Sequence, residues 1–154
     1  MTVHWCGAGL SAIPGLRRLI KNGYDVVVWN ITVDKANDAV GDITNNIRVF
    51  DKSSLQDCLE ENDIVVSMLP ADWHVPLASL AILKKAHFVS SSYIAPEMRI
   101  LDSEFKKINR VCINEVGLDP GIDHLMAHKL VSDYRQSKES VSYTHLTLPT
   151  SFEV

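Results

Sequence analysis

Short apolar runs alternate along this chain with stretches in which apolar residues recur every three or four positions. The runs are rich in β-branched residues and predict strands, whereas the stretches between them have the spacing of amphipathic helices. The expected strands are residues 2–6, 25–30, 47–50, 63–69, 87–91 and 110–114. The expected helices are residues 14–22, 33–40, 53–61, 75–85 and 96–108. Because helices separate the strands, the pattern predicts parallel βαβ units.

The expected strands are apolar on both faces, which is typical of parallel strands that helices cover on both sides. The chain therefore predicts an α/β fold with a doubly wound, mostly parallel sheet of the Rossmann type. Candidate N-caps are Ser53 for the third helix, and Asp119 or Asp123 for a further helix that opens near Gly121. Pro14 suits the first turn of the first helix, where a missing N–H is tolerated.

Composition narrows the class of protein. A chain of 154 residues with 46% hydrophobic and 22% charged residues fits one soluble globular domain. The net charge of -4 comes from interleaved acids and bases, which argues against a nucleic-acid partner. No signal peptide is recognisable, and no apolar stretch approaches the roughly 20 residues of a membrane span. The 3 cysteines lie far apart in apolar segments, as in a reduced protein, so we expect a cytoplasmic location.

The turn after the first expected strand reads CGAGLSA, residues 6–12, and has the form G-x-G-x-x-A. Gly7 permits the tight turn, Gly9 lets a pyrophosphate approach the backbone, and Ala12 allows close packing of helix on strand. The N–H groups at the start of the next helix would face the anion with the favourable end of the helix dipole. The turn predicts a dinucleotide cofactor.

The end of the second expected strand bears on the choice of cofactor. NAD enzymes usually place an acid there, which binds the ribose hydroxyls and repels the extra phosphate of NADP. This chain has Asn30, Ile31 and Thr32, with no acid until Asp34. The cofactor is therefore NADP or NAD, with NADP mildly favoured. Lys35 either adds a positive charge near that phosphate or is an ordinary solvated helix residue.

A second polar turn, GLDPGIDH at residues 117–124, follows the sixth expected strand. In open α/β sheets, ligands lie at this carboxyl edge. Gly117 and Gly121 leave room for a ligand to touch the backbone, and Asp119 either contacts that ligand or only caps the next helix. His124 and His128 have a spacing that can hold zinc, but we expect no metal because a third ligand is missing.

Trp73 and His74 follow the fourth expected strand and allow two interpretations. They cover the cofactor, or they are a packed aromatic residue and a loop histidine.

Four segments together resemble the saccharopine dehydrogenase family, in its glutamate-forming saccharopine reductase branch. They are GAGLSAIPGL (7–16), SMLPADWH (67–74), SSSYIAPEMRILD (90–102) and NEVGLDPGIDHLMA (114–127). The resemblance implies an NAD(P)-dependent oxidoreductase of lysine metabolism. Such an enzyme transfers hydride between the cofactor and the carbon beside the secondary amine of saccharopine, a small amino-acid substrate. The imine is hydrolysed to glutamate and aminoadipate semialdehyde, or the reaction runs in reverse.

The resemblance also implies roles for individual residues. Those around the nucleotide are Ala8, Gly9, Leu10 and Ser11 on the pyrophosphate, Asn30, Ile31 and Thr32 around the adenosine ribose, and Leu69 along the nucleotide. Those near the reacting centre are Ser91 and Ser92 beside the nicotinamide half, Ser92 and Tyr93 on saccharopine, and Leu118, Asp119 and Pro120 where cofactor and substrate meet. We expect Asp119 to orient the substrate, with acid/base catalysis as an open alternative. The family often has an arginine where this chain has Ile31, which leaves the choice between NAD and NADP open.

The resemblance further implies a substrate domain beyond this cofactor domain, so the chain is expected to be truncated. Residues 1–140 are expected to form its Rossmann domain. Whether the full-length enzyme is a homodimer is left open. Residues 141–154 are expected to be non-native, because VSYTHLTLPT at 141–150 matches the translation of a transposase adapter from DNA library preparation. The alternatives are a carboxynorspermidine dehydrogenase-like enzyme and a non-catalytic nucleotide-binding module.

Overall fold

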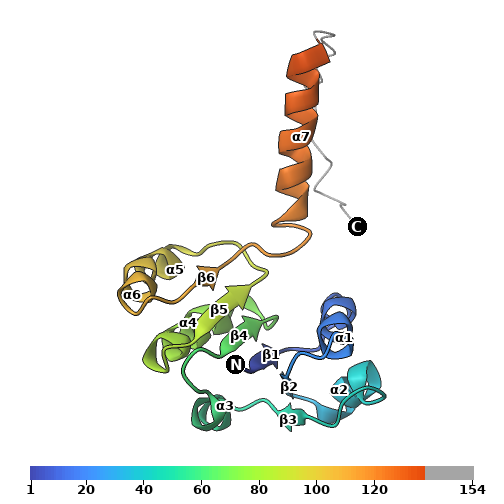
Figure 1. The fold of residues 1–154 in the computed structure, drawn as a ribbon, viewed down its shortest axis with the longest axis vertical. Helices are drawn as coiled ribbons and strands as arrows, with labels where there is room; N and C mark the ends of the chain where they lie inside the picture. Colours follow the sequence, from blue (N-terminus) through green and yellow to red (C-terminus); the bar gives the residue numbers. More distant parts are fainter. Residues whose placement is uncertain (138–154) are drawn as a thin grey trace, which may run out of the picture.

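Six parallel strands form one sheet in the order β3-β2-β1-β4-β5-β6 (Figure 1). The computed structural model describes residues 1–137, so the expected non-native segment lies outside the described residues. The strands are β1 (Val3–Cys6), β2 (Val26–Asn30), β3 (Ile47–Val49), β4 (Ile64–Ser67), β5 (His87–Ser90) and β6 (Cys112–Ile113). The strand order runs outward in both directions from β1 and β4, which confirms the doubly wound Rossmann-type sheet.

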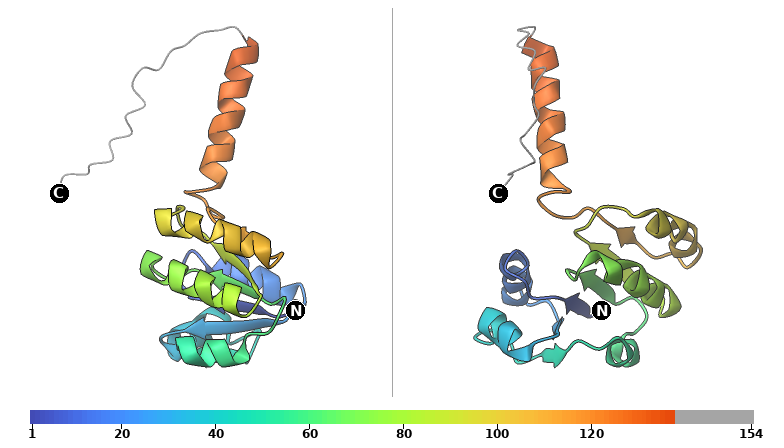
Figure 2. Two further views of the ribbon diagram at one scale, coloured as in Figure 1. Left: turned by 90° about the vertical axis from the view of Figure 1, so that its left-hand side faces the viewer. Right: turned by 180° about the vertical axis from the view of Figure 1, so that it is seen from behind.

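Helices cover both faces of the sheet. One face carries α1 (Ile13–Lys21) and α2 (Val33–Val40). The other carries α3 (Lys52–Cys58), α4 (His74–Leu83), α5 (Pro96–Ile100) and α6 (Asp102–Lys107), with the short 3-10 turn η1 (Ala71–Trp73) ahead of α4. The last helix, α7 (Ile122–Ser137), projects away from these layers in both views of Figure 2. Its apolar residues Leu125, Met126 and Leu130 are exposed.

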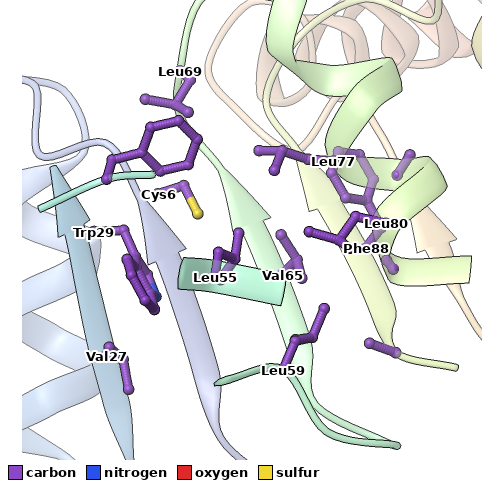
Figure 3. Close-up of a cluster of buried hydrophobic side chains, with 14 of the residues drawn as sticks. Cys6, Val27, Trp29, Leu55, Leu59, Val65, Leu69, Leu77, Leu80 and Phe88 are labelled. Carbon is purple, nitrogen blue, oxygen red and sulfur yellow. The ribbon is translucent and has the colours of Figure 1, made fainter. Parts of the chain in front are cut away.

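Apolar side chains fill the space between the sheet and each helical layer. On the α3/α4 face, Trp29 and Phe88 from the strands pack with Leu55 and Leu77 from the helices, and all four are almost fully buried (Figure 3). The opposite face has its own cluster, in which Leu16 of α1 is fully buried. The two clusters explain why the strands are apolar on both faces, because each strand sends alternate side chains to opposite sides of the sheet.

The single helix expected at 96–108 is wrong, because the structure has two helices there. The N–H of Leu101 donates to the carbonyl of Met98 at 3.2 Å, a tighter i to i−3 bond that closes α5. The carbonyl of Leu101 then accepts from Phe105, and α6 begins at Asp102. Met98 and Phe105 are both buried in the same cluster. Periodicity alone does not separate two short helices whose buried residues are seven apart.

The expected cap Ser53 is wrong, and of the two candidates for the last helix only Asp123 accepts a backbone hydrogen bond. Asp51 caps α3, since its carboxylate accepts from the N–H of Ser54 at 2.9 Å, whereas the hydroxyl of Ser53 donates to the same carboxylate. These hydrogen bonds, that from Ser53 first, lower the pKa of Asp51. At the start of α7, Asp123 rather than Asp119 accepts a backbone hydrogen bond, from the N–H of Gly121 at 2.8 Å. Helix α3 therefore begins beside an acid instead of the expected serine, whereas α7 begins beside one of the two acids that the sequence offered.

Candidate functional site

The glycine turn after β1 has the backbone that its sequence predicts. Gly7 has a φ of +102°, and a Cβ there would lie 2.8 Å from the carbonyl oxygen of Met68. A side chain at Gly7 would therefore strain the backbone and collide with the end of β4. A Cβ on Gly9 would meet nothing within 4 Å, so the protein itself leaves that space open. The two glycines thus serve different purposes, one for the fold and one for access.

Backbone donors are left free where the turn enters α1. The N–H groups of Gly9, Leu10 and Ser11 donate to no group among residues 1–137. All three residues are exposed, and Leu10 has 89% of its surface accessible. The helix begins at Ile13 with a proline in its first turn, as expected. Consecutive free N–H groups at the start of a helix form a binding site for an anion such as a phosphate.

Asn30, at the end of β2, ties the turn down. Its Oδ1 accepts from the N–H of Ala8 at 3.1 Å, and its Nδ2 donates to the carbonyl of Thr32 at 2.8 Å. The expected ribose residues Ile31 and Thr32 follow it and are exposed. The end of β2 therefore presents a neutral amide that is hydrogen-bonded to the protein. It lacks the carboxylate that would repel the extra phosphate of NADP.

The loops that follow β5 and β6 are bonded to each other at the same edge of the sheet. The N–H of Glu115 donates to the carbonyl of Ser92 at 3.1 Å, and the hydroxyl of Ser90 donates to Oδ1 of Asn114 at 2.8 Å. The carboxylate of Glu115 accepts from the N–H of Ile94 at 3.2 Å. Neighbouring parallel strands end side by side, which is why segments far apart in sequence meet here.

Tyr93 and Asp119 connect the tips of these two loops. The phenol of Tyr93 donates to Oδ1 of Asp119 at 2.5 Å, and both side chains are exposed. The hydrogen bond to Asp119 raises the pKa of Tyr93. A carboxylate that already holds one donor still has free lone pairs for an ammonium or an amine N–H. The pair therefore suits an amino-acid ligand.

A cavity of about 540 Å³ joins the glycine turn to these loops. It brings together several of the expected site residues, namely Ser11, Ala12, Ser91, Leu118 and Asp119. A cavity of this size, with an apolar lining and a few polar groups, suits part of a cofactor. Its position at the carboxyl edge, between the first turn and β4–β6, is where ligands of doubly wound sheets lie.

Other expected residues lie elsewhere. Leu69 is buried in the α3/α4 core cluster, 9% exposed, and Pro120 is also buried. Ile31 and Thr32 are not part of the cavity lining. Ser92 is half-buried between Ser91, which lines the cavity, and Tyr93, which reaches Asp119.

His74, for which the sequence left two interpretations open, contacts the expected site residue Ser92. Its Nδ1 lies 2.9 Å from Oγ of Ser67, and its Nε2 lies 2.7 Å from Oγ of Ser92. The interpretation as a loop histidine is wrong, because His74 opens α4 and is only 5% exposed. The available signal in the sequence was Ser67 itself, a hydroxyl at the last position of an apolar strand, where a buried hydroxyl requires a polar partner.

The residues from 1 to 137 contain no group of three His, Cys, Asp or Glu side chains placed to hold a metal ion. Nδ1 of His124 instead lies 3.1 Å from Oδ1 of Asp123. Within the same range, no helix is both long and apolar enough to cross a membrane.

Comparison with known proteins places this geometry in a family. The family model described as the saccharopine dehydrogenase NADP binding domain matches residues 3–113. The chain belongs to the saccharopine dehydrogenase family. Its sheet and glycine turn are therefore those of this family's NADP-binding domain, which confirms the resemblance and the expected NADP or NAD cofactor.

Members of the saccharopine dehydrogenase family are similar to the chain over most of its length. The glutamate-forming, NADP-dependent saccharopine dehydrogenase of Saccharomyces cerevisiae is 40% identical over 135 residues, which is 85% of this chain and 30% of that protein. An alpha-aminoadipic semialdehyde synthase of Arabidopsis thaliana is 34% identical over 79% of this chain and 12% of its own length. The apo structure of the S. cerevisiae enzyme superposes with a TM-score of 0.74, at 34% identity, over 88% of this chain and 31% of that one.

Proposed function

We propose that this chain is the cofactor-binding part of an NADP-dependent saccharopine dehydrogenase. The reaction would transfer hydride between NADP and the CH–NH carbon of saccharopine, giving glutamate and aminoadipate semialdehyde or running in reverse. The chain spans about 30% of the length of its fungal relatives, so the rest of such an enzyme would supply the remaining substrate contacts. The observation that carries the proposal is the cavity between the free N–H groups of the glycine turn and the Tyr93–Asp119 pair.

The glycine turn would hold the pyrophosphate. The free N–H groups of Gly9, Leu10 and Ser11 would donate to its oxygens, since they have no acceptor among residues 1–137. Gly7 and Ala12 would shape the turn, and Ala8 would stay anchored to Asn30. The adenosine ribose would lie near Ile31 and Thr32. Leu69 would support the glycine turn from inside the protein, because its buried side chain packs close to where a Cβ of Gly7 would be.

The loops after β5 and β6 would position the reacting groups. Ser91 would lie beside the nicotinamide, and Leu118 and Pro120 would shape the place where cofactor and substrate meet. The carboxylate of Asp119 would orient an amine of the substrate, with the phenol of Tyr93 fixing that carboxylate. The cofactor supplies the hydride chemistry when it is bound, and these residues contribute by positioning and by charge.

A titration with NADPH followed by its fluorescence tests the proposal directly. We expect the 154-residue chain to bind NADPH more tightly than NADH, because the end of β2 presents the amide of Asn30 instead of an acid. We expect no turnover of saccharopine by this chain alone. If neither NADPH nor NADH bound saturably, the cofactor role would be refuted. Equal affinity for both would refute the NADP preference.

The extent of the cofactor domain is part of the proposal. Residues 1–140 would form it, and residues 141–154 would not contribute to binding. The match of the family model to residues 3–113 supports the first part. A variant ending at residue 140 should bind NADPH within about twofold of the 154-residue chain. A larger loss would mean that residues 141–154 belong to the domain.

The proposed partners are NADP and a small amino acid, without nucleic acid. Kinetics of a full-length relative carrying these residues would separate saccharopine from carboxynorspermidine as the substrate. Its mass in solution would show whether the enzyme is a homodimer. Nucleotide binding without turnover of either substrate would favour a non-catalytic module.

A further inference from the structure

Ser67, His74 and Ser92 form a row of hydrogen bonds that starts inside the protein and ends at Ser92, next to Ser91, which lines the cavity. The two nitrogens of His74 lie 2.9 Å from Oγ of Ser67 and 2.7 Å from Oγ of Ser92. Ser67 is fully buried and His74 is 5% exposed, whereas Ser92 is half-buried. Each nitrogen therefore has one hydroxyl partner, and the tautomer of the ring decides the direction of both hydrogen bonds.

The buried end of the row fixes that direction. Among the residues that the structure describes, the hydroxyl of Ser67 bonds to His74 and to no other group. If the hydroxyl of Ser67 accepted a hydrogen bond from Nδ1–H, its own O–H would be buried without an acceptor, which is far less favourable than leaving a lone pair unused. Ser67 therefore donates to Nδ1. This preference amounts to roughly tenfold or more in the ratio of the two tautomers.

The outer end of the row follows from the inner one. Burial lowers the pKa of His74, so the ring is neutral near pH 7 and carries one proton. With Nδ1 accepting from Ser67, that proton sits on Nε2 and is donated to Oγ of Ser92. The O–H of Ser92 is then free to donate outward. Ser92 can satisfy either direction with water because it is half-buried, so it does not oppose the choice that Ser67 makes.

We propose that His74 is a positioning residue that holds Ser92 as a hydrogen-bond donor toward an acceptor oxygen of the bound ligand. The proposal rests on the proposed function, because it takes the cavity at this edge as the ligand site. The acceptor is a carbonyl or carboxylate oxygen. Two sources carry this chemistry: the carboxamide oxygen of the nicotinamide and a carboxylate of the amino-acid substrate. An ammonium group is disfavoured next to Ser92 and is left to Asp119, which lines the cavity.

The tautomer can be measured on the 154-residue chain without any ligand. Long-range proton–nitrogen correlation spectra of the 15N-labelled protein distinguish a protonated ring nitrogen from an unprotonated one. We expect the proton of His74 on Nε2. A proton on Nδ1 in the unaltered chain would overturn the proposal, because Ser92 would then donate inward to the ring.

Two substitutions of His74 separate positioning from a merely structural role. In His74→Gln, the side-chain amide reaches the place of Nε2 and can still donate to Ser92. In His74→Asn, the shorter amide keeps the contact with Ser67 but does not reach Ser92. We expect His74→Asn to weaken ligand binding about as much as Ser92→Ala does, roughly fivefold, with His74→Gln within about twofold of the unaltered chain.

A combined variant sharpens the comparison. His74→Asn in a Ser92→Ala background should cause no further loss, because both changes remove the same hydrogen bond. Losses that add, or that follow the melting temperature of each variant, would identify His74 as structural only and overturn the proposal.

The choice of ligand identifies the oxygen. A loss for NADPH but not for 2′-phospho-ADP-ribose, which lacks the nicotinamide, assigns the oxygen to the carboxamide. A loss only for saccharopine, added to the chain with saturating NADP, assigns it to a substrate carboxylate. No loss in either arm overturns the proposal. If the unaltered chain binds no NADPH, the proposed function fails, while the tautomer measurement still decides the direction of the two hydrogen bonds.

Discussion

Substitutions at the two glycines of the first turn should have opposite consequences. A Gly9→Val variant places its side chain in space that no atom of the protein occupies within 4 Å of the Cβ position. Such a variant should fold normally and lose NADPH. A Gly7→Ala variant places its Cβ 2.8 Å from the carbonyl oxygen of Met68 at a φ of +102°. It should lose stability first.

The magnitudes follow from these environments. For Gly7→Ala, a left-handed backbone costs about 1–2 kcal/mol, and relieving the contact with Met68 adds about as much. The total of roughly 2–4 kcal/mol would lower the melting temperature by about 10 °C. For Gly9→Val, the free energy of unfolding should change by less than about 0.5 kcal/mol. The side chain would keep the pyrophosphate from the free N–H groups, and losing about 3 kcal/mol of charged hydrogen bonding weakens binding about 100-fold.

The assay combines thermal unfolding, followed by circular dichroism, with a fluorescence titration of NADPH. Gly9→Ala serves as the graded control, since a methyl group should weaken binding less than an isopropyl group. NADPH affinity that is unchanged in Gly9→Val would refute the placement of the pyrophosphate on this turn. A Gly9→Val variant as destabilised as Gly7→Ala would refute the separation of access from folding.

Three further predictions concern other parts of the chain. Asp119→Asn should lower the pKa of Tyr93, because the hydrogen bond to Asp119 raises it, and an NMR titration of the tyrosine ring signals measures the shift; an unchanged pKa would contradict the hydrogen bond. Burial lowers the pKa of His4 below 6.5, so the unfolded chain takes up this proton first and stability should fall as the pH drops below about 6.5. In urea unfolding at pH 5 to 7, His4 should contribute up to about 1.4 kcal/mol per pH unit to the slope of the free energy of unfolding against pH, and His4→Asn should remove this contribution. An equal slope in that variant would mean that His4 is not its source. Leu55→Ala should cost about 2–5 kcal/mol of stability because Leu55 is fully buried, whereas Leu10→Ala, at an exposed position, should be nearly neutral; equal losses in chemical unfolding would contradict the core assignment.

The sheet was predictable because its strands are buried on both faces. Val28 and Val65, for example, lie in apolar runs that have no polar face to place toward water, and a glycine turn follows β1 at the expected position. The fold class and the family could therefore be predicted from short, local sequence patterns. The helix at 96–108 failed because the tight turn at Leu101 depends on how Met98 and Phe105 both reach the core.

The site was only partly predictable, because its polar groups are defined by partners distant in sequence. Asp119 stood out as an acid at the carboxyl edge, but the phenol that it accepts from belongs to Tyr93, 26 residues earlier in the chain. The role of His74 stayed undecided because a histidine at the start of a helix gives no sign of which hydroxyls it faces. The cap of α3 shows the same limit at short range: two hydroxyls and one carboxylate compete within four residues, and the carboxylate accepts.

The side chain of Asn30 constrains how cofactor preference can change in evolution or by design. One amide both fastens the glycine turn, through Ala8, and stands where an acid would select NAD. Replacement by aspartate keeps an acceptor for Ala8 and gives up only the donor to Thr32, so the switch toward NAD is open by a single substitution. Replacement by a residue without an acceptor would release the turn that both cofactors need. The residue at this position therefore determines both the choice between NAD and NADP and the anchoring of the glycine turn, and only a few residue types can do both.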